Sequence, residues 1–362
     1  MPHVFVTGFP GFLGSALLPR VLARLPEASA VCLVQPRFVE LARTRAAAIE
    51  AENPGAARRI RIVEGDVTRP GLGLADGPVL QRDTIEIFHL AAVYDLSVPR
   101  EVGMRVNVDG TRHVLDFAAG CPQLQRFQYV STCYVSGRHR GLFHEDDLEL
   151  GQTFNNFYEE TKQLAEVEVR RRMADGLPAT IFRPSVVVGD SVTGETQKYD
   201  GPYFVLQWVL RQPRVAVVPV VGRTGEHEFN MVPRDFVVGA IAYLSGCPRA
   251  LGRTYQLADP RPLTVDRLLR EIARVTGRRM MRVRLPLGLA KWSIARVPGV
   301  YELLQIPAST VDYFVHPTRY DTRHASADLA GSGIVCPAVP DYLPAMVAYM
   351  ERHPEVSTAA MV

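Results

Sequence analysis

The chain has 362 residues, of which 47% are hydrophobic and 22% are charged, and its formal net charge is +3. This length and apolar content suit a large globular core, and the balanced charge gives no general attraction for nucleic acid, which we exclude as a partner. The five cysteines are odd in number and widely spaced, so we expect neither a disulfide framework nor a metal site. Because no segment approaches the roughly 20 uninterrupted apolar residues of a membrane span, we expect a cytoplasmic protein without a transmembrane segment.

The N-terminal stretch predicts a strand, a tight turn and a helix. Residues 3–7 are apolar and rich in β-branched and aromatic side chains, three glycines follow, and apolar residues then recur at helical spacing. In a dinucleotide-binding fold such glycines permit the turn, the approach of a pyrophosphate and close packing of the helix, whose N-terminus faces the phosphates. The expected cofactor cradle comprises Gly8, Phe9, Pro10, Gly11, Phe12, Leu13 and Gly14. The loop alone is also compatible with an ordinary strand-to-helix turn.

The end of the second strand, residues 30–34, decides between two cofactors. A site that prefers NAD usually places an acidic side chain there to bind the ribose hydroxyls. This chain has Gln35, Pro36 and Arg37 instead. We expect Gln35 and Arg37 to contact the cofactor, and Arg37 to bind the 2′-phosphate of NADP(H), with a solvated loop arginine as the alternative. NADP(H) is therefore expected in preference to NAD(H).

Further strands are predicted at residues 60–67, 84–92 and 126–137, with a helix over 102–119. Ligands of open parallel sheets bind at the carboxyl ends of the strands. There the third strand offers an aspartate that can hydrogen-bond an adenine amino group, and the fourth ends in small residues that leave room for a cofactor. These expected cofactor contacts are Asp66, Val67, Leu90, Ala91 and Ala92.

Four polar residues form the expected catalytic group. Tyr158 and Lys162 are four residues apart in a strongly helix-forming segment, so both project from one face. A tyrosine can donate the proton that a carbonyl oxygen needs as a hydride arrives, and a nearby ammonium lowers the pKa of that tyrosine. Thr132 or Ser131, at the end of the fifth strand, would hold the substrate oxygen. Asn107 would anchor a water relay to the lysine, which would also bind the nicotinamide ribose.

The alternation of strands and helices weakens after a sixth strand at 178–189. The elements expected beyond it are helices near 203–210, 264–276 and 340–352 with irregular runs between them, and a helix at 237–244 and a strand at 254–258 that return to the main sheet.

This order predicts an α/β fold, a Rossmann-type doubly wound parallel sheet with a smaller, discontinuous C-terminal substrate-binding lobe. The NAD(P)-binding Rossmann domain would comprise residues 1–189 and 235–260. The substrate-binding lobe would comprise residues 190–234 and 261–362.

Taken in order, the motifs resemble those of the extended short-chain dehydrogenase/reductases, in the epimerase/dehydratase-like superfamily. They span about the first 190 residues: Thr7-Gly8-x-x-Gly11-x-x-Gly14, Gly65-Asp66-Val67, His89-Leu90-Ala91-Ala92, Asn107-Val108-Asp109-Gly110-Thr111, Val130-Ser131-Thr132, Tyr158-x-x-x-Lys162 and Arg183-Pro184-Ser185. The resemblance places the catalytic hydroxyl on Thr132. It also implies that Arg183, Pro184 and Ser185 contact the nicotinamide carboxamide.

Within that family, residues 65–74 and 187–195 look similar to the branch of fatty acyl-CoA reductases and of the thioester-reductase domains of carboxylic acid reductases and peptide synthetases. The resemblance implies NADPH-dependent reduction of an acyl thioester to an aldehyde. Two features depart from that branch. The strand-end arginine common there is Gln35 here. These 362 residues also show no carrier or adenylation domain, so we expect a thioester to arrive as free acyl-CoA or on a separate carrier.

We therefore expect an NADP-dependent oxidoreductase that reduces an apolar carbonyl compound or acyl thioester, with Tyr158 as proton donor. The expected partner is this small-molecule substrate, and a homodimer is compatible with the sequence. Aromatic residues of the lobe suggest a hydrophobic pocket, with an ordinary core as the alternative: Tyr199, Tyr203, Phe204, Trp208, Trp292, Tyr301, Tyr313 and Phe314.

Three other functions remain open. A nucleotide-sugar epimerase or dehydratase with tightly bound NAD would need Arg223 and Arg234 for a diphosphate. A hydroxysteroid-type dehydrogenase and a non-enzymatic cofactor sensor would use the same fold. Residues 282–304 combine basic and apolar side chains, which is compatible with weak contact to a membrane surface or with a lid or core helix of the lobe.

Overall fold

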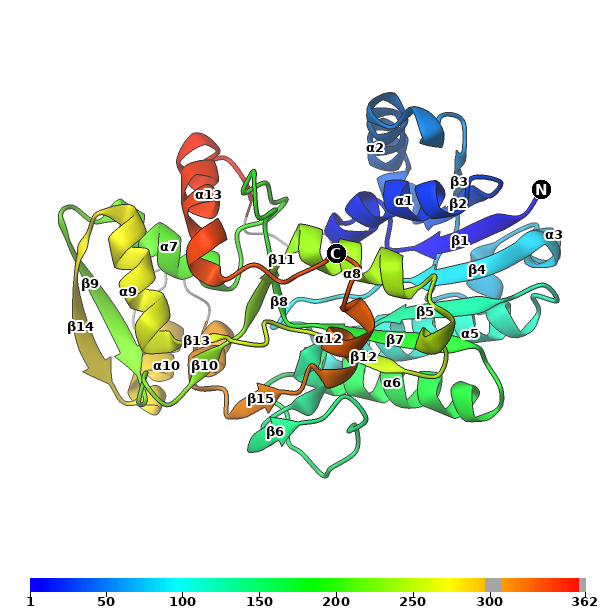
Figure 1. Cartoon of the computed structure of the whole chain (residues 1–362). Coiled ribbons are helices and arrows are strands. Elements are labelled where there is room, and N and C mark those ends of the chain that lie inside the picture. Colours follow the sequence, from blue (N-terminus) through cyan, green and yellow to red (C-terminus); the bar gives the residue numbers. More distant parts are fainter. Residues whose placement is uncertain (297–307, 358–362) are drawn as a thin grey trace.

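A seven-stranded parallel sheet lies at the centre of the computed structural model, which describes residues 1–296 and 308–357 (Figure 1). Its strand order is β12-β7-β5-β4-β1-β2-β3, with the first strand of the chain near the middle. The strands are β1 (His3–Thr7), β2 (Ser29–Val34), β3 (Ile60–Glu64), β4 (Thr84–His89), β5 (Arg126–Val130), β7 (Ala179–Pro184) and β12 (Thr254–Leu257). All of these strands except β3 are almost completely buried, because helices cover both faces of the sheet.

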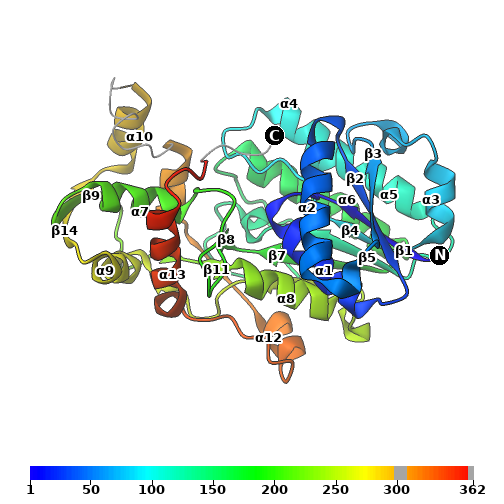
Figure 2. The same ribbon diagram turned by 90° about the horizontal axis from the view of Figure 1, so that it is seen from above.

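Helices pack on the two faces in two groups, one above and one below the sheet in Figure 1; in Figure 2, seen from above, the first group lies in front of the sheet and the second behind it. One face carries α1 (Phe12–Arg24), α2 (Val39–Glu52) and α8 (Arg234–Leu244). The other face carries α5 (Gly110–Ala119) and α6 (Phe157–Ala174), with α3 (Gly77–Asp83), α4 (Arg100–Gly103) and the π-helical turn η4 (Met104–Asp109) near α5 and α6. The predicted α/β class and doubly wound parallel sheet are confirmed.

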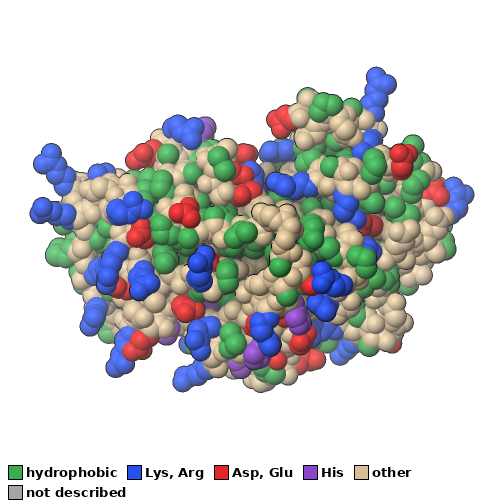
Figure 3. All heavy atoms as spheres, in the orientation of Figure 1, with side chains coloured by type: hydrophobic (Ala, Val, Ile, Leu, Met, Phe, Trp, Pro, Cys, Tyr) green, Lys and Arg blue, Asp and Glu red, His purple; other side chains and the backbone are tan. Residues whose placement is uncertain are grey.

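A smaller lobe lies beside the carboxyl ends of these strands, at the left of Figure 1. Its helices are α7 (Pro202–Arg211), α9 (Val265–Thr276), α10 (Leu287–Arg296), the 3-10 helix η7 (Ala308–Val315) and α13 (Val339–Arg352). The predicted helices at 203–210, 264–276 and 340–352 correspond to α7, α9 and α13. Basic side chains gather on the outer face of this lobe (Figure 3), while the apolar sides of its helices form a core of their own.

Short strand pairs complete the structure. In the lobe, β9 (Val215–Val221) pairs in parallel with β14 (Arg279–Leu285), and β10 (Glu228–Phe229) pairs with β13 (Leu263–Thr264). The pairs β8 (Val186–Val188) with β11 (Met231–Pro233) and β6 (Gly141–Phe143) with β15 (Thr318–Tyr320) join distant parts of the chain. The segment 282–304, considered for membrane contact, is described only as far as residue 296. Within residues 1–296 and 308–357, no helix has the length and hydropathy needed to cross a bilayer.

The chain passes repeatedly between the sheet and the lobe. After leaving the sheet at β7 it returns at α8 and β12, enters the lobe again, and comes back as α12 (Arg323–Leu329), which packs on β12 and α8. The buried Glu145 carboxylate fixes this last return by accepting the amides of Gln256, His324 and Ala325. Residues far apart in the sequence are thus tied to one edge of the sheet.

A buried ion pair joins α6 to the sheet. Arg183 of β7 and Glu166 of α6 are fully buried, and Nη2 of the arginine lies 2.6 Å from Oε1 of the glutamate. Ser131, at the end of β5, donates to the same carboxylate at 2.6 Å. Burial alone would raise the pKa of Glu166, but the charge of Arg183 and the hydrogen bonds hold that pKa below its ordinary value.

Replacing Arg183 with methionine should destabilise the fold by about 3 kcal/mol, because it leaves the Glu166 carboxylate buried without its main partner. Chemical unfolding of wild-type and variant proteins measures this loss. The matched control is Arg171→Ala, which removes an exposed partner of Glu168 on the same helix and should cost less than about 0.5 kcal/mol. Equal losses in the two variants would contradict a special role for the buried pair.

Candidate active site

The turn between β1 and α1 brings three glycines close to the neighbouring backbone. Gly8 has a φ of +87°, and a Cβ there would lie 2.8 Å from atoms of Leu90 and Ala91. A Cβ on Gly14 would lie 2.6 Å from the Gly8 carbonyl oxygen. At Gly11, the helix N-cap, there is no side chain to accept the first amides of α1, and the first turn has no acidic residue. This tight turn and its free helix amides fit a pyrophosphate.

The ends of β1 and β4 are joined beside this turn. The Thr7 hydroxyl lies 2.7 Å from Nδ1 of His89 and accepts a hydrogen bond from the Ala91 amide. The other ring nitrogen of His89 lies 2.9 Å from the Thr111 hydroxyl. Burial, assisted by the charge of Lys162, lowers the pKa of His89 to about 3, so the ring is neutral. His89 thus has a structural place beneath the cradle.

Thr132 and Tyr158 come together at the carboxyl edge of the sheet. The Thr132 hydroxyl donates to the Pro184 carbonyl at 3.4 Å. Burial raises the pKa of Tyr158 to about 12, and the neighbouring Thr132 side chain acts in the opposite direction. The direction is opposite to the lowering expected from the sequence. The phenol is consequently protonated at neutral pH and holds a proton that it can donate.

Lys162 is 3% exposed and points beneath Tyr158 toward the sheet. Its Nζ donates to the Tyr129 hydroxyl at 3.1 Å and to the Val130 carbonyl at 3.0 Å, and it lies 4.6 Å from the centre of the Tyr129 ring. Burial lowers the pKa of Lys162 to about 8, although the charge of Glu166 acts in the opposite direction. The described hydrogen bonds of Lys162 therefore go to β5, and its interaction with Tyr158 stays a prediction.

Asn107 lies in the π-helical turn η4 and is almost fully buried. Its side-chain oxygen accepts the Val93 amide, and its side-chain nitrogen donates to the Val93 carbonyl and to the Thr161 hydroxyl. The side chain thus links the loop after β4 to the residue that precedes Lys162. The predicted water relay is not tested by these contacts.

The end of β7 offers a polar atom to a ligand. That atom is not part of the Arg183 side chain, because the guanidinium points into the core and donates to Glu166 and to the carbonyls of Glu145 and Asp147. Ser185 is 5% exposed, and its hydroxyl has no hydrogen-bond partner among the described residues. A buried unpaired hydroxyl costs about 1–3 kcal/mol. Together with the glycine turn, this atom fits a nicotinamide dinucleotide, whose carboxamide could supply the missing hydrogen bond.

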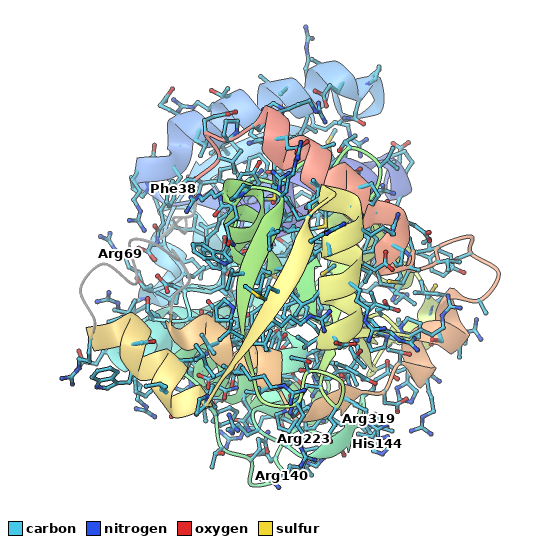
Figure 4. The ribbon with its side chains drawn as sticks, turned by 90° about the vertical axis from the view of Figure 1, so that its left-hand side faces the viewer. Phe38, Arg69, Arg140, His144, Arg223 and Arg319 are labelled. Carbon is cyan, nitrogen blue, oxygen red and sulfur yellow. The ribbon has the colours of Figure 1, made fainter. Side chains whose placement is uncertain are left out.

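The adenosine end of the expected cofactor site is more open. The exposed Arg37 donates from Nε to the Gln35 side chain at 3.0 Å, and its guanidinium lies 4.7 Å from the centre of the Phe38 ring. The Asp66 carboxylate accepts the Thr68 amide. Figure 4 shows Phe38 and Arg69 on the same side of the molecule. Arg69 belongs to the stretch 65–74 that resembles the reductase branch, but that resemblance assigned no role to this side chain.

Sequence reasoning also missed a small group beside Tyr158. Nζ of Lys198 lies 4.7 Å from the centre of the Tyr94 ring and 2.9 Å from the Asp200 carboxylate. Burial raises the pKa of Tyr94, and interactions with Asp200 and Tyr158 contribute to the rise. These residues come from two loops distant in sequence, so no spacing could have revealed their proximity. In the described part of the chain, His, Cys, Asp and Glu side chains form no group that could hold a metal ion.

A family model described as Male sterility protein matches residues 6–241. The chain belongs to this family. Its members are NAD(P)-dependent reductases of the extended short-chain dehydrogenase/reductase type, similar to thioester and acyl-CoA reductases. The predicted family resemblance, enzyme class and NAD(P)-binding fold are confirmed, whereas the preferred nucleotide is not determined.

Curated relatives of this male sterility family protein are larger proteins. The linear gramicidin synthase of Brevibacillus parabrevis has a subunit that is 29% identical over 74% of this chain and 5% of its own length. L-2-aminoadipate reductase of Saccharomyces cerevisiae is 28% identical over 70% of this chain and 20% of its own. Fatty acyl-CoA reductase 1 of Arabidopsis thaliana is 30% identical over 42% of this chain and 35% of its own length. The chain thus spans well under half of the length of each relative.

Solved structures agree with the fold. The terminal R domain from the myxalamid biosynthetic pathway is 27% identical, with a TM-score of 0.84 over 99% of this chain and 92% of that one. UDP-glucuronic acid 4-epimerase from Bacillus cereus is 17% identical with a TM-score of 0.68, covering 99% of each chain, and shares the fold alone.

The buried Lys162 ammonium predicts a pH-dependent stability difference between the wild type and Lys162→Met. The pKa of Lys162 is lower in the folded protein, about 8, than in an unfolded chain, so the wild type gains stability as the pH rises through this interval. Between about pH 7.5 and about pH 9.5, the difference in unfolding free energy should shift by about 2 kcal/mol toward the wild type. Chemical unfolding at the two pH values measures it. A difference independent of pH would refute the lowered pKa.

Proposed function

We propose that this protein is an NADP-dependent reductase that converts an apolar acyl thioester into an aldehyde, with Tyr158 as proton donor. The observation that carries the proposal is the proximity of Thr132 and a protonated Tyr158 at the carboxyl edge of the sheet, the same edge at which the glycine turn follows β1. The similarity to acyl-CoA reductases and to reductase domains of peptide synthetases supports a thioester over other carbonyl compounds.

The residues divide the chemistry among them. When bound, the reduced nicotinamide supplies a hydride to the carbonyl carbon. Thr132 orients the carbonyl oxygen, and Tyr158 donates its proton to that oxygen as negative charge develops there. The hemithioacetal that results then collapses: the carbon–sulfur bond breaks, its electron pair leaves on sulfur, the hydroxyl proton passes to that sulfur to give the thiol, and the aldehyde forms. The balance is one thioester, one NADPH and one proton to one aldehyde, one thiol and one NADP⁺, with the proton of Tyr158 restored from solvent.

Lys162 assists this step from its position against β5. Its ammonium is held by the Tyr129 hydroxyl and the Val130 carbonyl, so its position is fixed before any ligand binds. In that position it would bind the nicotinamide ribose and stabilise the phenolate left on Tyr158. Asn107 acts as a positioning residue through Thr161.

In the nucleotide-sugar alternative, both candidate arginines are already paired with carboxylates. Arg234 pairs with Glu195 at 3.2 Å and with Asp190 at 3.7 Å, and Arg223 pairs with Glu226 at 3.0 Å. A sugar diphosphate would have to displace these carboxylates before either guanidinium could bind it.

Tyr158→Phe should lower kcat by about 1,000-fold, because it removes the proton donor while keeping the ring. NADPH oxidation in the presence of decanoyl-CoA measures turnover, and fluorescence titration should show nearly unchanged cofactor binding. Tyr243→Phe, which changes a half-exposed tyrosine of α8, is the matched control and should keep full activity. Full activity in Tyr158→Phe would end the proposed mechanism.

Arg37→Ala should raise the KM for NADPH about tenfold and leave the KM for NADH nearly unchanged, because only NADPH has the 2′-phosphate. Arg69→Ala tests the second cation at that end in the same assay. Arg43→Ala, which changes an exposed arginine of α2 paired with Glu40, serves as control. Equal effects of Arg37→Ala on both cofactors would remove the proposed phosphate contact.

A further inference from the structure

An apolar cavity of about 80 Å³ lies inside the lobe. Its wall is formed by side chains of β9, α7, α9, α10 and η7 and by the end of β14, the elements that face the viewer in Figure 4. Six residues show its character: Trp208, Val218, Leu285, Ala290, Val311 and Phe314. Of the aromatic residues predicted to form a pocket, Trp208 and Phe314 border this cavity, Trp292 is 57% exposed, and Tyr301 lies outside the described residues.

Only three polar side chains among the described residues line the cavity, those of Trp208, Thr224 and Ser293, and two of them already have hydrogen-bond partners in the protein. The indole nitrogen of Trp208 donates to the Val217 carbonyl at 2.7 Å, and the Ser293 hydroxyl donates to the Ala290 carbonyl at 2.9 Å. Ordered water in a cavity needs two to four polar partners, and apolar cavities without them stay dry or take apolar guests. Each methylene group transferred from water into such a space lowers the free energy. The cavity therefore favours a hydrocarbon.

The volume indicates how much hydrocarbon fits. A single water needs about 10–15 Å³ of such cavity volume. The cavity of about 80 Å³ thus has room for about six groups of that size. A methylene group is similar in size to a water molecule, so this volume matches the end of a medium-chain acyl group.

One turn of the lobe separates this cavity from the catalytic residues. Val311 and Phe314 of η7 face the cavity, whereas Tyr313 faces the sheet domain. The Tyr313 hydroxyl accepts a hydrogen bond from the Asn156 side chain at 3.0 Å, and its ring meets the Tyr134 ring edge-on at 4.6 Å.

These two contacts lead directly to the reacting residues. Asn156 caps α6 by accepting the Glu159 amide, and it stands two residues before Tyr158. Tyr134 donates its amide to the Thr132 hydroxyl. The cavity and the catalytic pair thus lie on opposite sides of the same turn.

We propose that this cavity binds the distal end of the acyl chain while the thioester carbonyl lies at Thr132 and Tyr158. The assignment rests on the proposed function and names its substrate class, a saturated acyl thioester of medium length. Ala290 and Phe314 then set the length of the acyl chain that the protein accepts. The small Ala290 side chain leaves space in the cavity, and the Phe314 ring limits how far the chain can extend.

The two tryptophans allow a test of binding that does not need turnover. Trp292→Phe leaves Trp208, in the cavity wall, as the sole tryptophan of the chain. Titration of this variant with decanoyl-CoA, without cofactor, should change the Trp208 emission in a saturable way, and acetyl-CoA at the same concentrations should not. Equal responses to the two ligands, or none to either, would overturn the assignment.

Cavity variants test the same site by activity. Ala290→Phe fills the space and should raise the KM for decanoyl-CoA at least tenfold while leaving acetyl-CoA kinetics nearly unchanged. Ala348→Phe, the same substitution on the exposed face of α13, is the matched control. Phe314→Ala enlarges the cavity and should move the preference toward longer chains, which keeps the test decisive if Ala290→Phe does not fold.

Failure of this assignment differs from failure of the proposed function. Binding of decanoyl-CoA at Trp208 with no oxidation of NADPH or NADH would refute the reductase and keep the cavity as an acyl site. NADPH oxidation with the same chain-length profile in the wild type and in both cavity variants would keep the reductase and refute the acyl site.

Discussion

The site depends on the buried ion pair between Arg183 and Glu166. It connects β7 to α6, and through Ser131 the same carboxylate reaches the end of β5. Ser131 precedes Thr132 and Arg183 comes two residues before Ser185, while Glu166 lies one helical turn after Lys162. A single carboxylate therefore connects the three elements that carry the proposed catalytic residues. Burying the charges of Arg183 and Glu166 costs free energy, but the pair holds the ends of β5 and β7 in defined positions relative to α6.

Burial also shifts the pKa values of the titratable side chains at this site. Lys162 and Tyr158 lie in a region where charge is disfavoured, so the lysine releases its proton more readily and the tyrosine keeps its proton more firmly than in water. A donor that stays protonated suits reduction of a carbonyl. The Ser185 hydroxyl has no hydrogen-bond partner among the described residues, and in the proposed function a bound ligand would supply one.

The sequence predicted the features that depend on neighbouring residues along the chain, but not the contacts between residues far apart in the chain. Continuous apolar runs, the glycine turn and the four-residue spacing of Tyr158 and Lys162 carry enough information for the sheet and the helix face. The partner of Arg183 could not be predicted, because Glu166 meets it only once α6 packs on β7. The pairing of β9 with β14 was missed because both strands lie where the alternation of strands and helices has weakened, and because about 60 residues separate them.

The repeated passage of the chain between sheet and lobe has a mechanical consequence. A lobe attached by one linker could swing freely, but this one is anchored through β8–β11, β6–β15 and the Glu145 contacts with the start of α12. Such parallel tethers resist twisting and separation more than they resist a small rocking motion. The lobe is thus held at several separate places, so any change in its position relative to the sheet has to strain more than one of these connections at once.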